Sequence, residues 1–92
     1  MSNLATISKL QKKTFWNDNQ TSYVEITLTE TFCIAGNNYA TVRLSRANTR
    51  GLRQGTQTIF ENENYLERAR KYFDSIVDLK CALKIIKVNE NE

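Results

Sequence analysis

Several residue types that commonly carry chemistry are missing from this 92-residue sequence. It contains no histidine, the commonest general base and a frequent metal ligand, so a Cys–His or Ser–His nucleophile is excluded within the chain. It also has no GxGxxG or GxxxxGK[ST] phosphate loop. The acidic pair Asp74 and Asp78 fits a salt-bridging helix surface better than a catalytic dyad. We therefore expect no enzyme activity, no cofactor, no bound metal and no small-molecule substrate.

Long apolar runs, a secretory signal and a cysteine framework are also lacking. No apolar segment approaches the ~20 residues of a membrane span, and residues 1–4 have neither the charged nor the apolar block of a signal peptide. Cys33 and Cys81 have no metal-binding spacing, and small thiols in a reducing compartment explain them better than a disulfide. The length predicts a single domain, 1–92. Because the apolar runs are short, we expect no membrane partner.

Alternating apolar residues predict a β-hairpin. The alternation runs through 23–34 and resumes in 39–45. A three-residue loop, 36–38, would pair Phe32 with Val42 and place both apolar rows on one face.

Glu30 interrupts this apolar pattern, and the predicted pairing places it opposite Leu44. We expect a bulge there, or strand ends that extend past the core. The N-terminal stretch is predicted to be an edge strand, and residues 17–20 to be the turn that follows it. Lysines in that stretch would protect the edge from pairing with another chain: Lys9, Lys12 and Lys13.

Apolar residues at three- and four-residue steps predict a helix over about 62–79. The stripe consists of Leu66, Ala69, Phe73, Ile76 and Val77. On the outer face, the i,i+4 pairs Glu67–Lys71 and Arg70–Asp74 would neutralise each other.

The remaining C-terminal pattern completes the predicted fold. Residues 83–88 are predicted to be a closing strand and 89–92 a frayed tail, while 56–60 is either a short strand or the approach to the helix. The predicted class is α+β: a small antiparallel sheet of three to four strands, with one main helix packed on one face.

The segment 43–58, RLSRANTRGLRQGTQT, is predicted to be an arginine-rich loop. It has four arginines and no acidic residue, a composition typical of segments that contact phosphates. A basic loop that only aids solubility is the alternative, but like charges this close repel each other unless a partner relieves them. The candidate partner- or phosphate-binding residues are Arg43, Arg46, Asn48, Arg50 and Arg53, together with Lys12, Lys13 and Tyr39.

Aromatic residues add a second candidate surface. Tyr23 and Tyr39 fall with Arg43 on the sheet face opposite the apolar rows, while Trp16 is expected in a turn, partly buried. Exposed aromatics can stack on nucleotide bases, and tyrosine is equally a common hot-spot residue of protein interfaces. The pattern leaves both uses open.

Three stretches carry a resemblance to known proteins: MSNLATISKLQKKTFWND, SRANTRGLRQGTQTIF and YLERARKYFDSIVDL. With them the chain resembles the small phage-encoded anti-CRISPR proteins directed against the type I-F (Csy) surveillance complex. The resemblance implies a stoichiometric inhibitor in the host cytoplasm that docks on the backbone subunits of this crRNA-bearing complex and blocks target-DNA binding. It leaves a contact to the crRNA itself open. Anti-CRISPR proteins share no fold or motif, so no functional residue is transferred.

Two other classes of function remain alternatives. A stand-alone nucleic-acid-binding phage protein would use the same segment, Arg43–Arg53, and would bind naked DNA or RNA. A structural phage or plasmid protein would need neither partner and would self-assemble.

The missing catalytic residues generate the first testable prediction. Incubation with nucleic acids, nucleotides and the surveillance complex should leave every component chemically intact, because the chain offers no histidine and no coherent carboxylate site. Mass spectrometry of all components checks this. Any product of turnover would contradict it.

Overall fold

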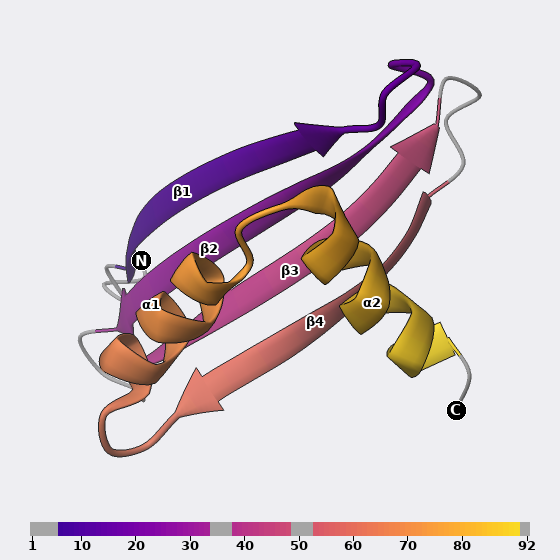
Figure 1. The fold of residues 1–92 in the computed structure, drawn as a ribbon. Coiled ribbons are helices and arrows are strands. Elements are labelled where there is room, and N and C mark those ends of the chain that lie inside the picture. The colour runs from indigo at the N-terminus through magenta and orange to yellow at the C-terminus, as the bar shows by residue number, and fades with distance from the viewer. Residues whose placement is uncertain (1–5, 34–37, 49–52, 91–92) are drawn as a thin grey trace.

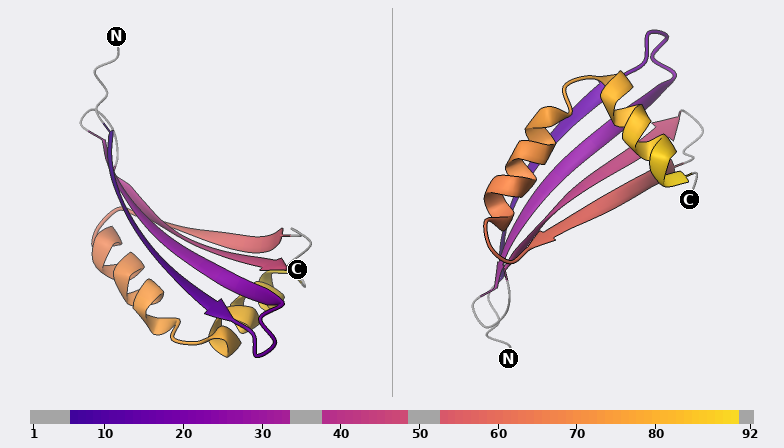
Figure 2. Two further views of the ribbon diagram at one scale, coloured as in Figure 1. Left: turned by 90° about the horizontal axis from the view of Figure 1, so that it is seen from above. Right: turned by 60° about the horizontal axis from the view of Figure 1, so that its bottom comes forward.

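The computed structural model describes residues 6–33, 38–48 and 53–90 (Figure 1). Within these residues, four antiparallel strands form one sheet in the order β1-β2-β3-β4, and two helices follow. The elements are β1 (Thr6–Trp16), β2 (Ser22–Cys33), β3 (Tyr39–Asn48), β4 (Arg53–Glu61), α1 (Tyr65–Ser75) and α2 (Leu79–Glu90). The sheet is curved, and both helices lie on the same face of it (Figure 2). The α+β class is confirmed, but with two helices instead of one main helix.

The hairpin of β2 and β3 has a different register from the predicted one. Leu28, not Phe32, lies opposite Val42, and Glu30 lies opposite Ala40. The two apolar rows still share one face, because the shift is an even number of residues. The expected bulge at Glu30 is wrong, since pairing runs without interruption along β2. The predicted loop lies mostly outside the described residues.

The predicted N-terminal edge strand and its turn are confirmed. β1 pairs with β2 along its whole length. Asn17 organises the turn: its Oδ1 accepts the backbone N–H of Thr21 at 2.8 Å, and its carbonyl accepts the N–H of Gln20 at 3.0 Å. Gln20 adopts a positive φ of 56°, which a turn of this kind demands of one residue.

The predicted helix over 62–79 is interrupted. α1 ends at Ser75, whose hydroxyl donates to the carbonyl of Tyr72 at 2.7 Å, and Ile76 is extended. Ile76 remains buried, but Val77 is 66% exposed. Val77 was expected in the buried stripe; it leaves the stripe because the chain no longer turns helically at that point.

A second helix replaces the predicted closing strand over 83–88. Asp78 begins it: its carboxylate accepts the backbone N–H of Cys81 at 2.8 Å, the role of an N-cap, and this bond lowers the pKa of Asp78. Ala82 and Ile86, one helical turn apart, are buried. The buried residues of this segment therefore follow the spacing of a helix and not that of a strand. The predicted frayed tail is helical through Glu90; residues 91–92 lie outside the described residues.

The predicted loop over 43–58 is wrong, because most of it is strand. β3 continues to Asn48 and β4 begins at Arg53, so the segment 56–60 also belongs to a strand. At Gly55 the backbone of β4 comes very close to β3: a Cβ built there would lie 2.3 Å from the carbonyl oxygen of Leu44. Only glycine fits this approach without a backbone shift.

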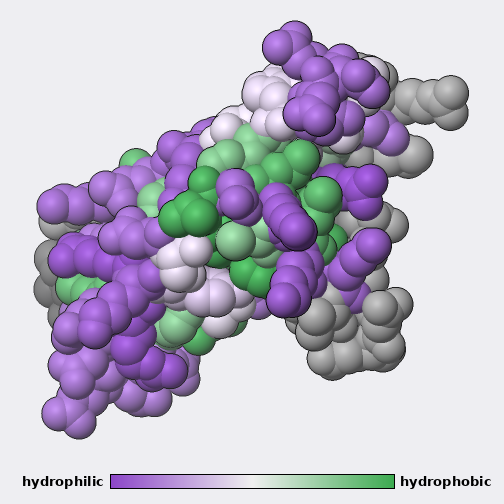
Figure 3. All heavy atoms as spheres, in the orientation of Figure 1, coloured by the Kyte–Doolittle hydropathy of each residue, from purple (hydrophilic) through white to green (hydrophobic). Residues whose placement is uncertain are grey.

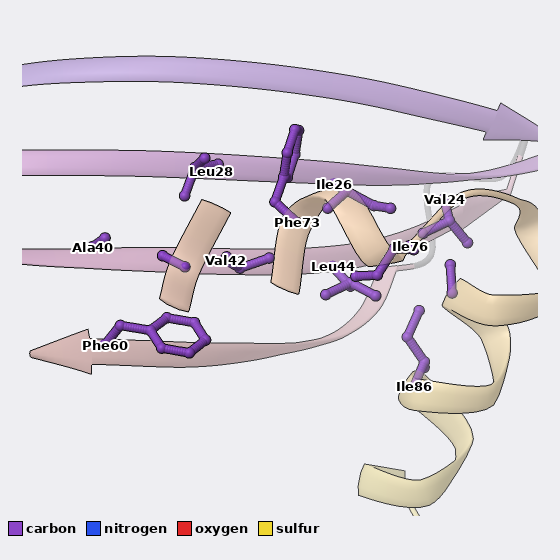
Figure 4. Packing of buried hydrophobic residues seen from close by; sticks show 12 residues of the cluster. Val24, Ile26, Leu28, Ala40, Val42, Leu44, Phe60, Phe73, Ile76 and Ile86 are labelled. Atoms are coloured by element: carbon purple, nitrogen blue, oxygen red, sulfur yellow. The ribbon is translucent and has the colours of Figure 1, made fainter. Parts of the chain in front are cut away.

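The core lies between one face of the sheet and the two helices (Figure 4). α1 contributes Phe73, which lies over the sheet residues Ile26 and Leu28, while Ile86 of α2 packs near Leu44. Phe73 is 7% exposed, and the Nζ of Lys13 lies 4.3 Å from its ring centroid, a cation–π distance. No helix in the described part of the chain is long and apolar enough to cross a membrane.

A bidentate ion pair fixes α1 to the sheet. The Nε and Nη2 atoms of Arg70 donate to the two carboxylate oxygens of Glu30 at 2.7 and 2.9 Å. Glu30 is only 5% exposed, and the hydrogen bond from Arg70 holds the pKa of Glu30 below its ordinary value. The predicted pair of Arg70 with Asp74 is therefore wrong, whereas Lys71 and Glu67 do pair, at 3.5 Å.

The core predicts the effect of removing the Phe73 ring. Phe73→Ala should lower the free energy of unfolding by about 3–5 kcal/mol, because it leaves a cavity beneath α1. Urea denaturation measures the loss. The exposed Val77→Ala serves as control and should change stability by no more than about 0.5 kcal/mol. A loss of less than about 1 kcal/mol for Phe73→Ala would contradict this packing.

The ion pair predicts a pH-dependent stability difference. A carboxylate with a lowered folded pKa contributes stability above its ordinary pKa of 4.5, and this contribution is lost as the pH falls through the lowered value. Glu30→Gln should therefore be less stable than the wild type at neutral pH, and the gap should shrink below pH 4.5.

Urea denaturation from neutral pH down to about pH 2 measures this gap. Glu67→Gln is the matched control, because the side chain of Glu67 is 65% exposed, and its gap should be small throughout. A gap for Glu30→Gln that stays constant with pH would show that its carboxylate is not stabilised in the folded state.

Candidate functional site

The face of the sheet opposite the two helices carries no helix (Figure 2). Successive side chains of a strand point to opposite faces of a sheet, so this face carries the side chains that alternate with the buried ones. We call this surface the open face; its main side chains are Leu10, Lys12 and Trp16 of β1, Tyr23, Glu25, Thr27, Thr29 and Thr31 of β2, Tyr39, Thr41 and Arg43 of β3, and Gln57, Ile59 and Glu61 of β4.

Exposed apolar residues gather on the open face. Of the five large hydrophobic residues that are exposed in the described part of the chain, four lie there: Leu10 (60%), Trp16 (52%), Tyr39 (38%) and Ile59 (56%). Leu10 and Ile59 stand at the two ends of one cross-strand row whose middle is formed by Thr29 and Thr41. Single exposed apolar residues are ordinary, but a group of them on one face is typical of an interaction surface.

Two aromatic groups mark opposite ends of the open face. The rings of Trp16 and Tyr23 pack against each other with centroids 4.7 Å apart, next to the buried Ala47. Tyr39 lies at the far end, beside a shallow hollow that Thr31 and Ile59 also line. The predicted side for Tyr23 and Tyr39 is confirmed. Trp16 is not in the turn: it is the last residue of β1 and half exposed.

The charges of the open face are nearly balanced. Lys12 and Arg43 belong to one cross-strand row, with Thr27 between them. The Nζ of Lys12 lies 3.7 Å from a carboxylate oxygen of Glu25. Glu61 adds a second negative charge, so the open-face residues whose side chains the structure describes carry two positive and two negative charges; Arg53 belongs to the same row of β4 as Glu61 by register.

The predicted arginine cluster is divided by the strands. Arg43 and Arg46 are three residues apart on β3, so they lie on opposite faces of the sheet. Arg53 begins β4 opposite Ala47, and Asn48 ends β3 opposite Ser22. Arg50 lies outside the described residues. Arg43, Arg46 and Arg53 therefore lie on two strands and not on one loop, so the segment does not form the single-loop phosphate site that was predicted.

Lys13 has a structural place instead of an exposed one. It lies on the helical side of β1 and is half-buried over the ring of Phe73. This cation–π contact explains the position of Lys13 without a contact to a partner molecule. Of the two lysines named as candidates, only Lys12 therefore lies on the open face.

A hollow between β1 and α1 contains the ion pair of Glu30 and Arg70. It is lined by Lys9, Glu30, Arg70 and Asp74, among others. Both carboxylate oxygens of Glu30 accept hydrogen bonds from Arg70, and its lowered pKa keeps it ionised and unable to act as an acid near neutral pH. Among the described residues, no group of three or more His, Cys, Asp or Glu side chains could hold a metal ion. Cys81 is a free, partly buried thiol.

Sequence reasoning missed several surface residues. Leu10 and Ile59 were not recognised, because the inner and outer faces of their strands were not assigned; the alternation of Leu10, Lys12 and Trp16 was the available signal. Lys80, Lys84 and Lys87 form an exposed stripe on α2, visible in the sequence as i, i+4, i+7 spacing once that segment is helical.

The helical side differs from the open face in its layout. Figure 3 shows apolar atoms gathered over the middle of that side, with hydrophilic side chains around them. Val77, in the connection between α1 and α2, is its most exposed large apolar residue in the described part of the chain. This side therefore offers positions for control substitutions that match those on the open face.

Comparison of the chain with protein-family models, with curated proteins and with solved structures finds no match.

Proposed function

We propose that this protein is a non-enzymatic binding protein that docks on a partner macromolecule through the open face. One observation carries the proposal: the uncovered sheet face holds four of the five exposed large hydrophobic residues in the described part of the chain. Tyr39, Trp16 and Arg43 are residue types enriched at binding hot spots. The paired strands of the sheet hold them in a fixed arrangement.

The chemistry of the open face favours a protein surface over naked nucleic acid. Binding to nucleic acid draws most of its affinity from an excess of positive charge, whereas Lys12 and Arg43 are offset there by Glu25 and Glu61. Apolar residues mixed with threonine hydroxyls resemble a protein interface, which is about as apolar as the remaining surface and poor in charge at its centre.

The specific partner we propose is the host type I-F surveillance complex, as the resemblance implies. In this proposal the protein acts in the host cytoplasm and covers backbone subunits of the complex, so that target DNA no longer binds. Arg43, at the centre of the open face, is the residue best placed to reach an RNA phosphate beside a protein contact. The support is the resemblance together with the open face.

The test compares matched double variants on the two sides of the sheet. Leu10→Asp/Arg43→Glu replaces an exposed apolar residue and a cation on the open face. It should weaken binding to the complex by at least about tenfold. Val77→Asp/Lys84→Glu makes the same changes on the helical side and should bind like the wild type. All four positions are exposed, so both variants should keep the wild-type melting temperature.

The measurement is a binding titration and a pull-down with the surveillance complex, with and without crRNA, alongside inhibition of target-DNA binding. If only the helical-side variant lost binding, the interface would lie on the helical side and the proposal would be wrong. Tight binding of the wild type to free single-stranded RNA, with a log–log salt slope of about 0.7 per phosphate contact, would instead identify a stand-alone nucleic-acid-binding protein.

A further inference from the structure

The two edges of the sheet differ in how they are protected. β1 forms one edge and carries Lys9, Lys12 and Lys13, and lysines on an edge strand discourage pairing with another chain. β4 forms the other edge and is nine residues long. It has no lysine and no proline, and its only charged residues are Arg53 at its start and Glu61 at its end. β4 therefore lacks the usual features that protect an edge strand.

The outer side of β4 is also open to another strand. Within the described residues, no backbone hydrogen bond joins β4 to any segment other than β3. No strand lies beyond β4 in the sheet, and α2 crosses β4 on the helical side (Figure 1). Every second N–H and C=O group of β4 therefore points outward without a backbone partner in that part of the chain.

The sequence of β4 is complementary to itself in the antiparallel direction. Centred on Gln57, a second copy of the strand would overlap the first along all nine residues. This register places Arg53 opposite Glu61 at both ends, and opposite charges in a cross-strand pair attract. It also places Ile59, which is 56% exposed, opposite Gly55. Gly55 has no side chain that could obstruct the isoleucine.

We infer that β4 is a self-association edge, through which two copies of this chain pair antiparallel about Gln57 into one continuous eight-stranded sheet. The two-fold axis of this pairing is perpendicular to the sheet. Both pairs of helices therefore lie on one side, and the two open faces form a single surface on the other. The inference does not rest on the proposed function, since it follows from the edge alone.

A charge exchange tests the register. Arg53→Glu would place two glutamates opposite each other at both ends of the interface, and Glu61→Arg would place two arginines there. Each single variant should weaken dimerisation by at least about tenfold. The double variant Arg53→Glu/Glu61→Arg restores opposite charges and should restore the dimer. Sedimentation equilibrium of the full chain, with circular dichroism to verify folding, measures both.

Disulfide cross-linking provides an independent test of the centre of the interface. In a Cys33→Ser/Cys81→Ser background, Gln57→Cys should cross-link two copies under mild oxidation, because directly opposite residues have the Cα separation of a disulfide. Ile59→Cys is the matched control and should not cross-link, since the two copies of residue 59 would be about 13 Å apart.

Three results would overturn the inference. They are a wild type that stays monomeric up to about 1 mM, a double charge variant that does not recover association, and cross-linking at residue 59 in preference to residue 57. The open-face variant Leu10→Asp/Arg43→Glu leaves β4 unchanged and should dimerise like the wild type. Failure of partner binding and failure of dimerisation are therefore separable.

Discussion

The fold depends on covering one long apolar sheet face with only a few turns of helix. The sheet is elongated, in a molecule that measures 47 × 28 × 24 Å, whereas α1 and α2, with 11 and 12 residues, are each about 17 Å long. The chain breaks its helix after Ser75, and Asp78 begins a second one. α1 covers one half of the face and α2 the other, while the pair of Glu30 and Arg70 fixes the outer side of α1 to β2. The opposite face remains uncovered as a result.

Residue periodicity predicted the faces of the central strands but not their pairing partners. Any even shift of register leaves Leu28 and Val42 on the buried face, so alternation could not distinguish the observed pairing from the predicted one. The interruption after Ser75 was missed because Ile76 and Val77 continue the helical spacing of α1. The apolar residues of segment 83–88 fit both a strand period of two and a helical period of 3.6. The burial of Ala82 and Ile86 shows that the fold uses the helical period.

The candidate surface was predictable where its strand was recognised. Tyr23, Tyr39 and Arg43 were assigned to the outer face because their strands alternate clearly. Lys13 was expected at a partner surface, but α1 brings Phe73 beneath its ammonium group, a contact that joins segments far apart in the sequence. Glu30 looked like an interruption for the same reason, since its partner Arg70 is also distant along the chain.

The threonines of the open face have a consequence for the entropy of docking. Thr27, Thr29 and Thr41 are β-branched, so their χ1 angles are already restricted by the strand backbone. Long polar side chains such as lysine or glutamine lose several freely rotating bonds when a partner orders them. A surface made mostly of short, stiff hydroxyl groups loses few. More of the contact free energy on this face therefore remains available as affinity.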